Sequence, residues 1–135
     1  KRTLRPVPQV SFSGEIEETM VRAHGDRLER VIGHLVQNAA EATTGDGHIW
    51  VRARRVGEQA VIEVEDDGNG MSERFIRENL FRPFSSTKEH GMGIGTFESR
   101  EYIRELGGRL EVVSREREGT TFRIVLPLES SAQAA

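Results

Sequence analysis

The stretch Ile62-Glu63-Val64-Glu65-Asp66-Asp67-Gly68-Asn69-Gly70 carries a strand pattern directly into a loop pattern. Ile62 and Val64 alternate with Glu63 and Glu65, which predicts a strand with one apolar and one polar face. The acids and glycines that follow are common turn formers, so a plain turn is one interpretation of them. A binding loop is the other. A carboxylate can accept a hydrogen bond from an exocyclic amine, and glycines let the backbone approach a flat ring closely.

A long helix is predicted upstream of this loop, over about residues 25–43. Its apolar side chains recur at the spacing of one helix face, namely Leu28, Val31, Ile32, Leu35, Val36, Ala39 and Ala40. Ahead of it, residues 10–13 and 16–22 are expected to form two short strands on either side of Gly14. Between the helix and the loop, alternation around Val51 predicts a strand over residues 49–54, followed by a hairpin loop at residues 57–59.

The chain downstream of the loop shows two more helix patterns and two more strand patterns. Ser72 is a candidate cap for a short helix to about Leu80. A second helix is predicted over residues 94–106, ended by two glycines. Strands are predicted over residues 109–114 and 120–128. This order predicts an α+β fold, a two-layer α/β sandwich in which a mixed sheet of about five strands packs on about three helices.

Composition narrows the class of protein. The 135 residues suffice for one domain with one core, expected over residues 1–128 with a disordered tail at 129–135. The net charge of −3 gives no indication of a nucleic-acid or membrane surface. The absence of cysteine excludes disulfides and thiolate metal sites, and it is compatible with a cytoplasmic location. Because the chain begins at Lys1, we expect a fragment of a longer protein, which could itself be anchored in a membrane.

The predicted long helix also carries a polar stripe beside its apolar face. His34, Asn38 and Glu41 lie at i, i+4 and i+7. The amide oxygen of Asn38 is a suitable ligand for Mg²⁺, a hard cation that prefers oxygen donors. A solvated polar flank is the alternative for this stripe taken alone.

A glycine-rich run, His90-Gly91-Met92-Gly93-Ile94-Gly95, leads into the second predicted helix. Peptide N–H groups at a helix N-terminus can cradle a phosphate. The run lacks the Gly-Lys-Ser/Thr of a Walker A loop and the preceding strand of a Rossmann fingerprint. A flexible connector is the alternative. Just before it, Phe81-Arg82-Pro83-Phe84 is interpreted as a hydrophobic anchor, and Lys88 as either a phosphate contact or an ordinary surface lysine.

The order of these features is more specific than any one of them. An Asn on a helix, Asp-x-Gly-x-Gly after a strand, Phe-x-Pro-Phe, and Gly-x-Gly-x-Gly opening a helix resemble the N, first-glycine, F and second-glycine boxes of histidine kinase catalytic domains. These domains belong to the GHKL superfamily of gyrase, Hsp90, histidine kinases and MutL. The resemblance covers roughly residues 10–128, including a closing strand at Gly119-Thr120-Thr121-Phe122. A narrower similarity over residues 91–108 points to kinases of PEP-CTERM exosortase systems.

The resemblance implies a Bergerat ATP-binding fold that holds ATP with Mg²⁺. Asn38 would ligate the metal, Asp67 would accept the adenine amine, and Thr120 would support the base pocket. Asn38, His34 and Lys88 would take part in catalysis, although many family members have Asn at the position of His34. The implied nucleotide-binding residues are Asn38, Asp67, Gly68, Gly70, Phe84, Lys88, Gly91, Gly93, Ile94, Gly95 and Thr120.

The resemblance also implies partners. The γ-phosphate would pass to a histidine on a separate dimerisation domain of the same protein and then to a response regulator. The usual surroundings of that acceptor histidine are absent from this sequence. Nucleic acid and direct membrane contact are not expected. Two alternatives share the fold, an anti-sigma-factor serine kinase and an ATP-gated binding module that transfers no phosphate.

Overall fold

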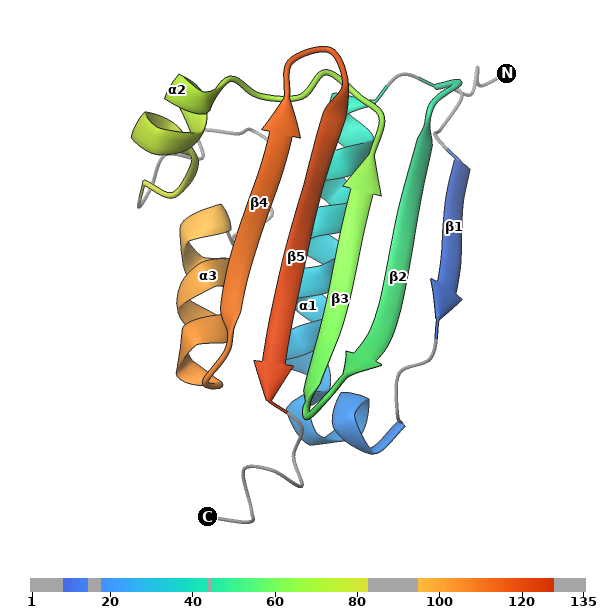
Figure 1. Cartoon of the computed structure of the whole chain (residues 1–135), viewed down its shortest axis with the longest axis vertical. Helices are drawn as coiled ribbons and strands as arrows, with labels where there is room; N and C mark the ends of the chain where they lie inside the picture. The colour runs from blue at the N-terminus through green and yellow to red at the C-terminus, as the bar shows by residue number, and fades with distance from the viewer. Residues whose placement is uncertain (1–8, 15–17, 44, 83–94, 128–135) are drawn as a thin grey trace, which may run out of the picture.

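The computed structural model describes residues 9–14, 18–43, 45–82 and 95–127, and in residues 9–27 it describes the backbone alone. Five strands form one sheet in the order β1-β2-β3-β5-β4 (Figure 1). β1 (Gln9–Gly14) runs parallel to β2 (His48–Val56), whereas β3 (Gln59–Asp66), β5 (Gly119–Pro127) and β4 (Arg109–Arg115) continue the sheet in antiparallel pairs. The predicted mixed sheet is therefore confirmed.

The second layer consists of helices packed on one face of this sheet. α1 (Glu18–Ala42) runs along the back of β3 and β5, and α3 (Thr96–Glu105) lies beside β4 (Figure 1). Buried side chains of both helices and of four strands form one core. The core contains Leu28, Val31, Leu35, Ala39, Ile49, Val51, Ala60, Ile62, Val64, Tyr102, Ile103, Leu110, Phe122, Ile124 and Leu126. Burying each large apolar side chain contributes about 1.5–3 kcal/mol, which holds the predicted two-layer sandwich together.

One predicted strand was wrong. Residues 16–22 were expected to be extended, but α1 begins at Glu18 and runs through Gly25. A glycine inside a helix costs only about 1 kcal/mol relative to alanine, so Gly25 does not mark the helix start. The apolar face predicted for this helix is confirmed, since Leu28, Val31, Leu35 and Ala39 are buried.

The predicted short helix after the loop is confirmed in two pieces. Ser72 caps α2 (Glu73–Phe75) by accepting a hydrogen bond from the backbone N–H of Phe75, and one π-helical segment, η1 (Ile76–Leu80), follows. α3 starts at Thr96 with Gly95 as its N-cap and ends before Gly107, whose φ of 86° favours glycine. The expected sites Phe84, Lys88, Gly91, Gly93 and Ile94, and the expected tail at 129–135, lie outside the described residues.

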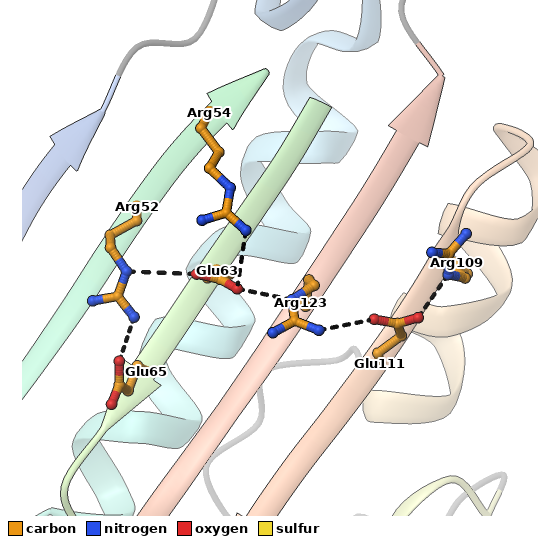
Figure 2. Close-up of polar contacts among 7 residues, drawn as sticks. All are labelled: Arg52, Arg54, Glu63, Glu65, Arg109, Glu111 and Arg123. Carbon is orange, nitrogen blue, oxygen red and sulfur yellow. Dashed lines mark hydrogen bonds and ion pairs between the residues drawn. The ribbon is translucent and has the colours of Figure 1, made fainter. Parts of the chain in front are cut away.

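The sheet face opposite the helices carries a row of charged side chains. Across the four antiparallel strands, Arg52, Glu63, Arg123 and Glu111 stand in register and alternate in sign (Figure 2). Glu63 is contacted by Arg52 at 3.5 Å, Arg54 at 4.0 Å and Arg123 at 2.8 Å, and Arg52 also pairs with Glu65. Arg123 reaches Glu111 at 3.2 Å, and Arg109 reaches the same carboxylate at 2.6 Å. This face is thus largely neutralised by its own side chains.

Candidate functional site

The loop after β3 is fixed between the end of α1 and the β4–β5 turn. The N–H of Asn69 donates to the carbonyl of Ala42 at 2.9 Å, and the N–H of Arg117 donates to the carbonyl of Asn69 at 2.5 Å. A Cβ on Gly68 would lie 2.2 Å from the Ala42 oxygen. One on Gly70, whose φ is 71°, would lie 1.9 Å from the oxygen of Arg115. The two glycines are required because two backbone segments approach the loop closely.

Asp66 closes β3 and is buried, with 5% of its surface exposed. It stands opposite Thr120 in the β3–β5 register. Its carboxylate accepts a hydrogen bond from the N–H of Gly68 at 2.8 Å. Burial raises the pKa of Asp66, although backbone hydrogen bonds from Gly68 and Thr120 oppose the shift. A buried carboxylate with few partners is a strong acceptor for a ligand donor.

Asp67 points elsewhere. Its side chain is 42% exposed, and its Oδ1 accepts a hydrogen bond from the backbone N–H of His48 at 2.9 Å. The geometry therefore favours Asp66 over Asp67 as a buried acceptor. The spacing of Asp-x-Gly-x-Gly already contained this signal, because the acid two residues before Gly68 is Asp66.

Thr120 is buried beside Asp66, and its hydroxyl lies 2.7 Å from Oγ of Ser114. Ser114 donates its single proton to the carbonyl of Gly119 at 3.0 Å and accepts from the N–H of Met71 at 2.8 Å. Either hydroxyl can be the donor between Ser114 and Thr120; when Ser114 donates to Gly119, Thr120 donates to Ser114 and keeps lone pairs of its own oxygen available. Ser114 was missed by the sequence reasoning, since only the strand register brings it to this place.

The polar stripe on α1 lies at the same end of the molecule as the loop. Asn38 lies one helical turn before Ala42, whose carbonyl accepts the hydrogen bond from the N–H of Asn69. The amide nitrogen of Asn38 lies 3.4 Å from Nε2 of His34. His34 is only 5% exposed. Burial lowers the pKa of His34 and outweighs the charges of Glu41 and Glu98, which would raise it. Burial therefore favours the neutral form of the imidazole.

The first turn of α3 carries Glu98, whose charge acts on His34 of this stripe. The N–H of Gly95 donates to Oε1 of Glu98 at 2.8 Å, so the helix start is capped by its own carboxylate. Arg100, one turn on, places its guanidinium 4.3 Å from the centre of the Phe81 ring. This contact joins the two described ends of the chain on either side of residues 83–94.

Within the described part of the chain, no group of three or more His, Asp or Glu side chains could hold a metal ion by itself. Asn38 uses its nitrogen toward His34 and keeps an amide oxygen for other partners. Mg²⁺ commonly takes one or two protein ligands and completes its shell with phosphates and waters. The amide oxygen of Asn38 thus fits a Mg²⁺ ion whose remaining ligands are phosphate oxygens and waters. None of the described helices is long and apolar enough to cross a membrane.

Comparison with known proteins agrees with this geometry. The model of the family described as histidine kinase-, DNA gyrase B-, and HSP90-like ATPases matches residues 23–130. The catalytic domain of histidine kinase ThkA, in a nucleotide-free form, superimposes with a TM-score of 0.71 at 29% identity, covering 88% of this chain and 78% of that one.

Curated relatives are similar in sequence to this chain over part of their own length. Sporulation kinase C of Bacillus subtilis is 31% identical over 118 residues, which are 87% of this chain and 27% of the relative. The C4-dicarboxylate transport sensor protein DctB of Rhizobium meliloti is 41% identical over 102 residues, which are 74% of this chain and 16% of the relative. The chain therefore spans about a quarter or less of these two sensor proteins.

Proposed function

Because this chain belongs to the family of histidine kinase-, DNA gyrase B- and HSP90-like ATPases, we propose that it binds Mg-ATP and donates the γ-phosphate to a histidine on a separate dimerisation domain. In this proposal it serves two-component signalling in the cytoplasm, and a response regulator receives the phosphate next. The similarity to named sensor kinases and to a histidine kinase catalytic domain supports the proposal. Assignment to PEP-CTERM systems stays a prediction.

The observation that carries this function is the buried carboxylate of Asp66 beside Thr120, in a loop attached to the end of the helix that bears Asn38. We assign the adenine amine to Asp66 in place of Asp67. Thr120 would offer its free lone pairs to the same base, directly or through water. Gly68 and Gly70 would shape this end by admitting the neighbouring backbone rather than by touching the base.

The phosphate end involves Asn38 and the glycine-rich run. Asn38 would contribute one oxygen to Mg²⁺, which neutralises charge on the phosphates when bound. Gly91, Gly93, Ile94 and Gly95 would supply backbone donors, with Lys88 as a charged donor and Phe84 as a hydrophobic anchor. Phosphoryl transfer asks for little covalent chemistry from the protein, so these residues act by positioning and by charge neutralisation. The acceptor histidine comes from the partner domain.

A matched pair of variants tests the adenine assignment. Asp66→Asn removes a charged acceptor and presents an NH₂ group toward the adenine amine, whereas Asp67→Asn changes an exposed carboxylate. Calorimetric titration with Mg-ATP should show affinity reduced at least about tenfold in the first variant. It should be near the wild-type value in the second. The opposite order would restore Asp67 as the acceptor, and a wild-type chain that binds no nucleotide would refute the function.

Phosphotransfer to the dimerisation domain of the parent protein separates the kinase from its alternatives. Incubation with radiolabelled Mg-ATP should place an acid-labile, base-stable phosphate on that domain. Label on a serine of an added anti-sigma-factor antagonist would support the serine kinase. Nucleotide binding without any transfer would support the ATP-gated module.

A further inference from the structure

The contact between His34 and Asn38 fixes the protonation of the histidine ring. An amide nitrogen can only donate a hydrogen bond, so Nε2 of His34, 3.4 Å from Nδ2 of Asn38, must accept it. Because an accepting ring nitrogen carries no proton, the proton of the imidazole is on Nδ1. In this tautomer the histidine acts as an acceptor toward the end of the helix where Asn38 lies.

The other ring nitrogen, Nδ1, shows that burying the imidazole at this position costs stability. Nδ1 of His34 is buried and makes no hydrogen bond within the described part of the chain. Buried polar groups without partners are rare in folded proteins. An apolar side chain at this buried position would avoid the unpaired donor. Among the described residues, the hydrogen-bond contact that the imidazole makes is the one between Nε2 and Asn38.

For Asn38 the consequence is a defined amide orientation. The two ends of an asparagine amide have nearly the same shape but opposite hydrogen-bonding character. An acceptor that holds the nitrogen leaves the oxygen on the opposite side of the amide. Only the oxygen can ligate a hard cation. Without an acceptor at position 34, the amide could turn and present its NH₂ group to the metal.

We propose that His34 is a positioning residue that holds the nitrogen of the Asn38 amide and so presents its oxygen to the Mg²⁺ of the bound nucleotide. This inference rests on the proposed binding of Mg-ATP. It assigns to His34 a role through Asn38 rather than contact with the transferred phosphate.

Two substitutions of similar length separate this role from simple packing. His34→Gln keeps an acceptor at about the position of Nε2, whereas His34→Met fills the space without one. ATP affinity is measured by calorimetry for both variants and the wild type, with saturating Mg²⁺ and with EDTA. The ratio of the ATP affinity with Mg²⁺ to the ATP affinity in EDTA should fall about fivefold to tenfold in the Met variant, as expected for one oriented hydrogen bond. It should stay near the wild-type ratio in the Gln variant. Affinities in EDTA should be equal in all three proteins.

The ring tautomer is measured independently in the wild-type chain, which covers the case in which a variant fails to fold. Long-range ¹H–¹⁵N correlation spectra should show Nδ1 protonated and Nε2 unprotonated. A proton on Nε2 would overturn the proposal, as would an unchanged Mg²⁺ ratio in the Met variant or an equal loss in the Gln variant. A wild-type chain indifferent to Mg²⁺ or to ATP would instead refute the proposed function and this inference with it.

Discussion

The guanidinium of Arg123 donates to the carboxylate of Glu63 at 2.8 Å, joining the two central strands β5 and β3 on the open face of the sheet (Figure 2). Glu63 is the least exposed acid of this row, with 9% of its side chain accessible. Three arginines surround it, and their long side chains cover its carboxylate. The row therefore depends on one nearly buried negative charge.

We expect Glu63→Gln to lower the free energy of unfolding by about 1–3 kcal/mol, because it leaves three arginines without their shared partner. Glu65→Gln is the matched control. That residue points to the same face, but its side chain is 38% exposed, and among the described residues its ion pair is with Arg52, so the loss should stay within about 1 kcal/mol. Urea unfolding followed by circular dichroism measures both. Equal losses would show that burial of Glu63 does not matter.

Acid should weaken the fold through the same row. Burial would raise the pKa of Glu63, but the hydrogen bond from Arg123 and the charges of three arginines lower it below 4.5. Hydrogen bonds from Arg109 and Arg123 likewise lower the pKa of Glu111. A carboxylate with a depressed pKa stabilises the fold above its ordinary pKa, and that stability is lost as the pH falls through the folded value.

The unfolding free energy should therefore decline below about pH 4.5 in the wild type and decline less steeply in Glu63→Gln. Urea titrations at a series of pH values measure the slope. Parallel slopes for the two proteins would mean that other carboxylates cause the acid sensitivity.

For Asp66 we expect a substitution to lower ATP affinity without lowering the stability of the fold. Its raised pKa means that the ionised form is disfavoured in the fold, so its charge costs stability at neutral pH. In Asp66→Asn the amide oxygen can still accept from Gly68. We expect the nucleotide-free variant to be as stable as the wild type or more stable, even though it loses ATP affinity. A clear drop in its melting temperature would show that the carboxylate is structural.

The isolated chain should not phosphorylate itself on His34. The ring is buried, and its unprotonated nitrogen already accepts from Asn38. In-line attack on a terminal phosphate needs a free nitrogen lone pair facing that phosphate. Incubation with radiolabelled Mg-ATP followed by acid and base stability tests is the measurement. Acid-labile, base-stable label that disappears in His34→Gln would identify this ring as an acceptor.

Periodicity in the sequence was sufficient for the sandwich and for most element positions. The apolar face of α1 and the alternation in β3 reflect burial directly, so they could be read without coordinates. Residues 16–22 could not be assigned correctly, because the sequence from Glu18 to Arg22 has no apolar period strong enough to separate helix from strand. The motif order predicted the acceptor at Asp67, and the geometry leads us to propose its neighbour Asp66 instead.

Features that depend on strand register were not predictable in the same way. Ser114 reaches Thr120 and Met71 only because β4 pairs with β5 in one specific alignment. The charged row on the open face has the same origin, since Arg52 and Arg123 are 71 positions apart in the numbering, yet both contact Glu63. Such contacts become visible only when the order of the strands is known.

The attachment of residues 66–70 to Ala42 on one side and to Arg117 on the other has a consequence for how ligand affinity can be lost. A recognition loop that folding has already ordered adds little entropic cost when a ligand arrives. A substitution that loosens either attachment would therefore weaken base binding without removing any atom that touches the base. Mutations at the end of α1 or in the β4–β5 turn would then look like binding mutations in a titration, although their origin is the rigidity of the free protein.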